Sequence, residues 1–195
     1  PIWEPNNLLS FLGRKKNESA GFLNPNPSFF GKILQYVRAN YFIPDARKFW
    51  IKPSVKFLKS YLAENNIDVI ITTGPPHSMH IIGLKLKRQL GVKWIADFRE
   101  PWSDLYYNND LNQKSYAKRK NKKLEESVLK QADCVVTVTK TLQKEFLKTA
   151  KKVEVITNGF DVEKVEKQTL DIKFSLAHIG SFLSERNPLI LWESL

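Results

Sequence analysis

The sequence predicts an α/β fold: a Rossmann-like parallel sheet with flanking helices. Two observations lead to this class. Short β-rich segments alternate with single helical segments along most of the chain, which is the pattern of right-handed βαβ units. The central β-rich segments, such as 134–138, are also nearly continuous apolar runs, which is typical of parallel strands that are buried on both faces.

The predicted elements follow in order along the chain. Residues 1–28 are rich in Pro, Asn, Gly and Lys and are typical of a loop. A helix is predicted over 29–40, and a second over about 53–65, where Pro53 suits a first helical turn and apolar residues recur at helical spacing. Strands are predicted at 68–72, 94–97, 134–138, 153–156 and 174–179. Helices are predicted at 78–90, which Gly91 ends, and at 113–131, about 140–149 and 187–195.

The composition limits the classes of protein to which the chain can belong. Its 195 residues, 42% of them hydrophobic, are enough for one sizeable core. Its net charge of +11 would attract nucleic acid, an anionic membrane surface or a phosphorylated small molecule. The single cysteine, Cys134, excludes a disulfide framework and a cysteine-based metal site, and it fits a reducing cytoplasm. No apolar stretch approaches the roughly 20 residues that a transmembrane helix needs.

Unusual polar residues gather at one edge of the predicted sheet. In open parallel α/β sheets, ligands bind beyond the carboxyl ends of the strands. The loops expected at that edge are 72–78, 97–104, 158–161 and 180–188, and they hold most of the polar residues that suggest a site. The sequence therefore predicts a small-molecule site at this edge.

The first of these loops leads into the helix predicted at 78–90. Its glycine and two prolines stiffen the backbone, and His77 and Ser78 stand where the helix starts, which is a position suited to binding an anion. The alternative is that Ser78 only caps the helix and that His77 is a surface residue.

The second loop is the richest in polar residues. Asp97 ends a buried strand, where its carboxylate could orient or deprotonate a sugar hydroxyl, and Trp102 could stack on a sugar ring. The alternative is an ion pair between Asp97 and Arg99 beside a packed tryptophan. In the loop at 180–188, Gly180 allows close approach to a ligand and Arg186 suits a diphosphate, although such loops are commonly only turns.

The helix predicted at 113–131 is highly basic. Lys114, Lys118 and Lys122 recur every fourth residue and share one face, with Arg119 and Lys123 beside them. One interpretation is a solvated helix face. The other is contact with the anionic leaflet of a membrane through residues 114–123.

Three segments resemble the family-4 glycosyltransferases of the GT-B fold, especially bacterial enzymes of cell-surface polysaccharide synthesis. The segments are ITTGPPHSMHIIGLKLKRQLGVKWIADFREPW at 71–102, ADCVVTV with VEVITNGFD at 132–138 and 153–161, and HIGSFLSERNP at 178–188. The segment YFIPDARKFWIKPS at 41–54 adds to the likeness, which extends over residues 41–190.

This resemblance implies two Rossmann-like domains, of which the N-terminal one binds the acceptor and the C-terminal one binds a nucleotide-sugar donor. It also implies transfer with retention of configuration and with neither a bound metal nor another cofactor. It implies that His77 and Asp97 are the catalytic candidates and that Arg99, Glu100 and Trp102 bind the acceptor. It places Asn158 and Asp161 in an interdomain turn, and it places Gly180, Ser181 and Arg186 beside the donor diphosphate. Many family members carry a basic residue where Ser181 stands, which leaves Arg186 as the main candidate for the phosphate contact.

The resemblance also sets the expected domain organisation of an incomplete GT-B architecture. The partial acceptor-side domain would occupy 1–160, a linker 161–172, and the first strand and helix of the donor-side domain 173–195. The family's Gly-rich loop would precede residue 1 and its paired-glutamate segment would follow residue 195, so we expect a truncated chain that is inactive by itself.

For the whole protein we expect hexosyl transfer to a cell-surface glycan or lipid-linked acceptor. The expected location is the cytoplasm, at the inner face of the cell membrane. One alternative is another nucleotide-sugar enzyme of the same fold, such as an epimerase. The other is a basic module that binds nucleic acid, although the sequence holds no motif for it.

Overall fold

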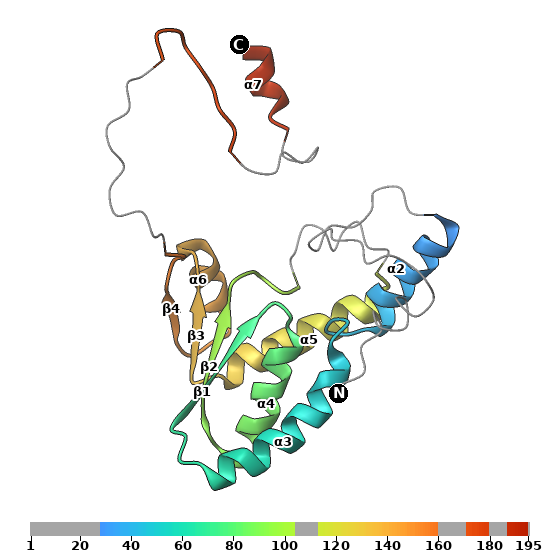
Figure 1. Cartoon of the computed structure of the whole chain (residues 1–195), viewed down its shortest axis with the longest axis vertical. Helices are drawn as coiled ribbons and strands as arrows, with labels where there is room; N and C mark the ends of the chain where they lie inside the picture. The colour runs from blue at the N-terminus through green and yellow to red at the C-terminus, as the bar shows by residue number, and fades with distance from the viewer. Residues whose placement is uncertain (1–27, 104–112, 160–170, 180–186, 195) are drawn as a thin grey trace. The chain divides into compact units, whose positions relative to one another are not determined.

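The computed structural model describes residues 28–103, 113–159, 171–179 and 187–194 (Figure 1). The chain divides into two units, Pro1–Asn158 and Gly159–Leu195. The first unit holds the sheet and its helices, and the second holds the short helix α7 (Leu189–Ser194). The assignment of these units to an acceptor-side and a donor-side domain stays a prediction.

The first unit is built on a four-stranded parallel sheet. Its strands are β1 (Val69–Gly74), β2 (Lys93–Phe98), β3 (Cys134–Thr137) and β4 (Val153–Val155), in the spatial order β1-β2-β3-β4. The register aligns Gly74 with Phe98 and Phe98 with Thr137, so the three strands end together at their carboxyl ends. The predicted Rossmann-like class with a parallel sheet, and the four strands predicted between residues 68 and 156, are therefore confirmed.

The helices agree closely with the sequence pattern. They are α2 (Phe29–Tyr41), α3 (Ile51–Glu64), α4 (Ser78–Leu90), α5 (Ser115–Gln131) and α6 (Lys140–Phe146). Helix α3 starts earlier than predicted because a 3-10 turn, η1 (Lys48–Trp50), runs directly into it. Gly91 ends α4 in the left-handed conformation, with φ of 69°, as its position predicted.

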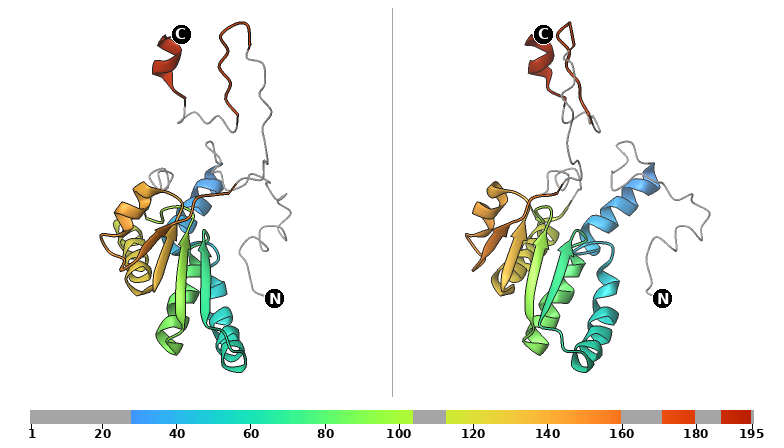
Figure 2. Two further views of the ribbon diagram at one scale, coloured as in Figure 1. Left: turned by 90° about the vertical axis from the view of Figure 1, so that its left-hand side faces the viewer. Right: turned by 60° about the vertical axis from the view of Figure 1, so that its left-hand side comes forward.

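One face of the sheet packs against helices α3, α4 and α5, which lie on the same side of it (Figures 1 and 2). Trp94, Ala96 and Phe98 alternate along β2 and are fully buried. Helix α4 approaches this face at Gly83, where a Cβ atom would lie only 2.4 Å from Trp94 Nε1. The rest of this core comes mainly from aliphatic side chains of the helices and β3, among them Ile81, Ile82, Leu84, Leu86, Val128, Leu129 and Val135.

The opposite face of the sheet is open at β1. Ile71 is 66% exposed, and Val69 and Thr73 on the same face are exposed too. The prediction of burial on both faces concerned the central strands; in the described part of the chain β1 lies at the edge of the sheet, and the opposite face of the central strands is half-buried at Ile95, Asp97, Cys134 and Val136. The reason is topological: strands in the order β1-β2-β3-β4 advance in one direction, and right-handed crossovers then place every connecting helix on the same face.

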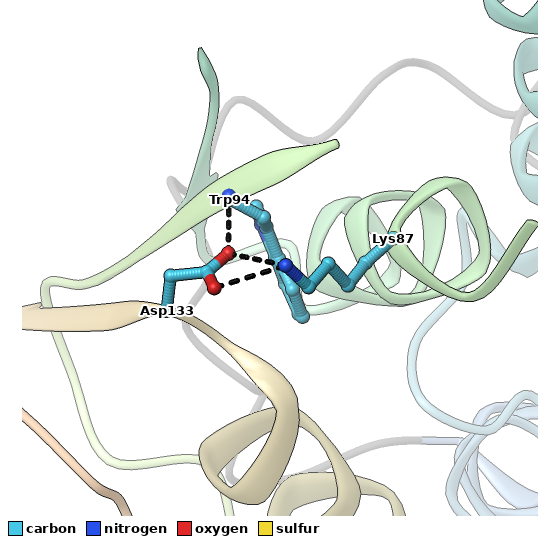
Figure 3. Close-up of polar contacts among 3 residues, drawn as sticks. All are labelled: Lys87, Trp94 and Asp133. Atoms are coloured by element: carbon cyan, nitrogen blue, oxygen red, sulfur yellow. Dashed lines mark hydrogen bonds and ion pairs between the residues drawn. The ribbon is translucent and has the colours of Figure 1, made fainter. Parts of the chain in front are cut away.

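The amino ends of the strands are tied together by Asp133, which precedes β3 (Figure 3). Its Oδ2 accepts a hydrogen bond from the Trp94 backbone N–H at 2.8 Å, and both carboxylate oxygens pair with Lys87 Nζ at 2.7 and 2.9 Å. These contacts lower the pKa of Asp133, chiefly through the hydrogen bond from Lys87. One carboxylate thus links α4, β2 and β3 at the end of the sheet remote from the predicted site.

The second unit differs from the prediction. Residues 174–179 were predicted to form a fifth strand, but the described segment 171–179 has no strand, and its apolar side chains, such as Phe174 at 82%, are exposed. A strand needs a neighbouring strand for its backbone hydrogen bonds, and no described residue provides one. The predicted helix near the end of the chain is present as α7, with Leu189, Ile190 and Trp192 exposed.

Candidate functional site

The candidate site lies at the carboxyl ends of β1 and β2, where two loops meet. The Arg99 backbone N–H donates to the Gly74 carbonyl at 3.1 Å, and its guanidinium Nη2 donates to the Pro75 carbonyl at 3.2 Å. Arg99 therefore links the second loop to the first and forms no ion pair with Asp97 in the described part of the chain. The alternative prediction of an Asp97–Arg99 ion pair is wrong.

Three charged residues near the start of the second loop reach the surface at this edge. Asp97 is half-buried and lies on the face of β2 opposite Phe98, while Arg99 and Glu100 are exposed. A partly shielded carboxylate such as that of Asp97 can accept a hydrogen bond from a hydroxyl group. The neighbouring charges of Arg99 and Glu100 can balance charge that develops on a reacting group.

Side chains of helix α5 accept hydrogen bonds from the end of this loop and so fix its position. The Trp102 backbone N–H donates to Glu125 Oε1 at 3.1 Å, its indole Nε1–H donates to Asn121 Oδ1 at 3.2 Å, and Ser103 Oγ donates to Glu125 Oε2. Trp102 is only 2% exposed, and Asn121 and Glu125 are buried as well. The buried position of Trp102 favours a packing role over the predicted contact with a sugar ring, which stays a prediction.

Beneath the loops, two histidines form an aromatic stack with the core. The ring of His77 lies parallel to the Trp102 indole at a centroid distance of 4.8 Å, and His80 stacks on Phe98 at 4.3 Å. Both imidazoles converge on Gly74, where a Cβ atom would lie 2.5 Å from His80 Nε2 and 3.1 Å from His77 Nδ1. Only glycine leaves room for this pair at the end of β1.

A buried hydrogen-bond chain fixes the second histidine. The indole Nε1–H of Trp94 donates to Thr72 Oγ1 at 2.9 Å, and Thr72 Oγ1 lies 2.9 Å from His80 Nδ1. Thr72 thus links the indole of β2 to the His80 ring of α4, and the direction of the Thr72–His80 hydrogen bond depends on the tautomer of the imidazole.

Burial keeps both histidines uncharged at neutral pH. Loss of solvent lowers the pKa of His77 to about 4, and burial together with the nearby His77 lowers the pKa of His80 to about 3. Neither His77 nitrogen nor His80 Nε2 has a hydrogen-bond partner among the described residues. The stack therefore acts at neutral pH as an uncharged support for the two loops.

The amino terminus of α4 is already occupied by an anion from the chain itself. The Ser78 backbone N–H donates to Asp45 Oδ2 at 2.7 Å, and the other Asp45 oxygen accepts from the Arg47 backbone N–H at 2.8 Å. The prediction of a free anion site at this terminus is therefore corrected, because the carboxylate of Asp45 takes that place. The alternative was also wrong, since His77 is buried and Ser78 makes no side-chain cap.

The structure brings part of the predicted site together. Five predicted residues, namely His77, Asp97, Arg99, Glu100 and Trp102, lie in or under the two neighbouring loops, and Asn158 is exposed beyond β4. Asp161, Gly180, Ser181 and Arg186 lie outside the described residues. The roles assigned to all of these residues stay predictions.

Sequence reasoning missed the residues that position the loops. Asn121 and Glu125 fall on the buried stripe of α5 with Ala117 and Val128, so two polar residues on an otherwise apolar helical face were the available signal. Asp45 lies 33 residues before Ser78, and nothing local to either segment indicates that the two meet.

The described residues hold no cluster of three or more histidine, cysteine or acidic side chains that could bind a metal ion. Over the same ranges, none of the helices combines the length and the apolar character needed to cross a bilayer. Two surface hollows lie at the opposite end of the sheet, and one is lined by Leu62, Asp68, Leu90 and Lys93. Neither hollow includes a predicted site residue.

The fold and the loop edge together define a Rossmann-like α/β domain whose polar groups gather where such sheets bind small molecules. A family model described as Glycosyltransferase Family 4 matches residues 14–164, which is most of the chain. The chain therefore belongs to glycosyltransferase family 4. Searches of curated proteins and of solved structures give no significant match.

Proposed function

We propose that this domain provides the acceptor side of an enzyme that moves a hexose from a nucleotide-sugar to a cell-surface glycan or a lipid-linked acceptor. The observation that carries the proposal is the charged loop Asp97–Glu100, held at the carboxyl edge of the sheet in a chain of glycosyltransferase family 4. The edge agrees with the general position of ligands in open α/β sheets. No metal or other cofactor is proposed for the reaction.

Each charged residue of the loop has a proposed role. Asp97 accepts a hydrogen bond from the acceptor hydroxyl, and so orients it or takes its proton while the new glycosidic bond forms. Arg99 and Glu100 bind other polar groups of the acceptor from the loop surface. His77 acts beneath them by holding Trp102, because its ring is buried against the indole and uncharged at neutral pH.

The same proposal includes a nucleotide-sugar as the donor and retention of the anomeric configuration in the product. The donor side would come from residues after Asn158, with Gly180, Ser181 and Arg186 beside the diphosphate. We expect the 195-residue chain alone to lack transfer activity, since only its first unit contains a folded sheet among the described residues. Detectable sugar transfer by the isolated chain would contradict this expectation.

The test uses the complete enzyme with the change Asp97→Asn. This change keeps the size of the side chain and removes its charge, so we expect kcat to fall by at least about 100-fold if Asp97 takes or orients the proton. A matched control is Glu145→Gln, because Glu145 lies on α6 in a surface pair with Lys148 at 2.6 Å. The assay follows nucleotide release with each common nucleotide-sugar, and NMR determines the anomeric configuration of the product.

The outcomes separate the candidate functions. Nearly unchanged turnover of the folded Asp97→Asn enzyme would exclude the proposed role of Asp97. An epimerised nucleotide-sugar with no acceptor present would instead favour an epimerase. The proposed location is the cytoplasmic face of the membrane, with residues 114–123 near its anionic lipids.

A further inference from the structure

Helix α2 exposes a continuous apolar face. Phe29, Phe30, Ile33 and Leu34 are 76%, 72%, 45% and 40% exposed. The other three follow Phe29 by one, four and five residues, which places all four on one side of the helix. Scattered apolar residues are normal on a protein surface, but four large side chains on one helical face form a patch that indicates a binding surface.

The carboxyl-terminal half of α2 is fixed to α5. Ala39 and Asn40 are buried, Gln113 Nε2 donates to the Ala39 carbonyl at 3.2 Å, and the Lys114 backbone N–H donates to Asn40 Oδ1 at 2.7 Å. Figure 1 shows α2 leading away from the start of α5. The contacts hold the helix at its end near Asn40, which leaves the apolar face near Phe29 exposed.

Cations lie on the other side of α2 and along α5 beyond the anchored end of the helix. Lys32 and Arg38 lie on α2 itself and are exposed. Lys114 lies over the Tyr36 ring at 5.7 Å, and Lys118 and Lys122 continue the same basic row along α5 with exposed side chains. A helix with an exposed apolar face on one side and exposed lysine and arginine elsewhere on its surface has the composition of a helix that lies in a membrane interface.

We infer that α2 docks the protein on a bilayer that contains anionic lipids, with the apolar face Phe29–Leu34 inserted and the basic row of α5 against the headgroups. Charge complementarity identifies the partner, because the exposed row of α5 is cationic and anionic headgroups attract it. Nucleic acid would be attracted by the same charge and could stack on Phe29 and Phe30, but it would gain little from the exposed Ile33 and Leu34 beside them. The inference adds an insertion element to the proposed function, and its test does not depend on glycosyl transfer.

The first experiment measures binding to sedimenting vesicles of phosphatidylcholine with and without phosphatidylglycerol. We expect binding only when the anionic lipid is present, and we expect the double change Phe29→Ser with Phe30→Ser to weaken it by at least about tenfold. The matched control is Phe57→Ser with Tyr61→Ser, a stacked pair on α3 that is 68% and 45% exposed. The control should bind as the unchanged protein does.

A second experiment reports insertion directly. The chain has one cysteine, so Cys134→Ser gives a background in which Phe30→Cys carries an environment-sensitive dye such as NBD. Its fluorescence should rise and shift to shorter wavelength when anionic vesicles are added. The same dye at Ser60→Cys on α3 should stay in water and show no change.

Three results would overturn the inference. The first is no binding of the unchanged protein to anionic vesicles at low salt. The second is binding that survives the Phe29/Phe30 change but is lost on Lys118→Glu with Lys122→Glu, which would show adsorption by charge without insertion. The third is an unchanged Phe30 dye signal combined with tighter binding to single-stranded RNA, which would identify a nucleic-acid surface. An inactive enzyme that still binds vesicles would refute the proposed function and leave this inference standing.

Discussion

Lowering the pH from 7 to 5 is expected to destabilise the sheet domain through its two buried histidines. In the folded chain the pKa of His77 lies near 4 and that of His80 near 3, because burial disfavours the charged ring. In the unfolded chain both rings titrate near 6.5. The unfolded state therefore binds more protons below pH 6.5, so the contribution of each ring is complete above that pH and is lost as the pH falls toward 4.

The magnitude follows from the pKa difference. Each proton that only the unfolded state binds costs about 1.4 kcal/mol per pH unit. Between pH 6.5 and 5 this gives about 2 kcal/mol for each histidine and about 4 kcal/mol for the pair. A loss of about 4 kcal/mol is a large part of the 5–15 kcal/mol that stabilises a typical domain.

The assay is urea unfolding at several pH values, followed by tryptophan fluorescence. The change His77→Phe isolates one ring: it keeps the stack on Trp102 and removes two nitrogens that have no partner among the described residues. We expect this variant to fold, to be no less stable than the unchanged chain at pH 7, and to lose only about 2 kcal/mol between pH 7 and 5.

Asp133 does not contribute to the change in unfolding free energy between pH 7 and 5. Its pKa is lowered below the ordinary 3.8, so its contribution is present throughout pH 5–7 and is lost only as the pH falls below that window. A change in unfolding free energy of less than about 1 kcal/mol between pH 7 and 5 would refute the reasoning. An equal pH slope in the unchanged chain and in His77→Phe would also refute it.

Three further changes are each tested by urea unfolding at pH 7. Gly83→Ala should destabilise by about 1–3 kcal/mol despite the better helix propensity of alanine, since its Cβ would meet the Trp94 ring at 2.4 Å; equal or higher stability would contradict that contact. Asp45→Ala should cost about 1–2 kcal/mol by removing the carboxylate that caps α4, with Asp45→Asn losing less; an unchanged midpoint for both would exclude the cap. Asp133→Ala should destabilise by about 1–2 kcal/mol because it leaves the Trp94 N–H without its acceptor, and Lys87→Met should destabilise less. If Lys87→Met costs more, the stabilisation comes from the ion pair and not from the hydrogen bond to Trp94.

Much of the fold was predictable because its signals are local. The end of helix α4 was predicted from Gly91, whose left-handed conformation ends the helix as expected. The four strands of the first unit were marked by short β-rich runs between helices. The segment 174–179 carries the same local signal but forms no strand among the described residues, because a strand also depends on a partner that lies elsewhere in the chain.

The candidate site was predictable only in its position. The rule that ligands bind beyond the carboxyl ends of parallel strands located the loops around Asp97 and His77. It gave no information on which side chains face outward. The structure leaves Arg99 and Glu100 exposed, and it buries Trp102 against His77, with Glu125 of α5 holding the loop.

The sequence by itself determined the α/β class, the order of the elements and the likeness to family 4, because periodicity, turn residues and motifs act over a few neighbouring positions. The tertiary structure alone decided which groups meet across long stretches of chain. Asp45 reaches the start of α4 from 33 residues away, and Asn40 meets Lys114 from 74 residues away. It also decided that α2 keeps an exposed apolar face and that both histidines lose their water, since burial depends on the whole packed fold.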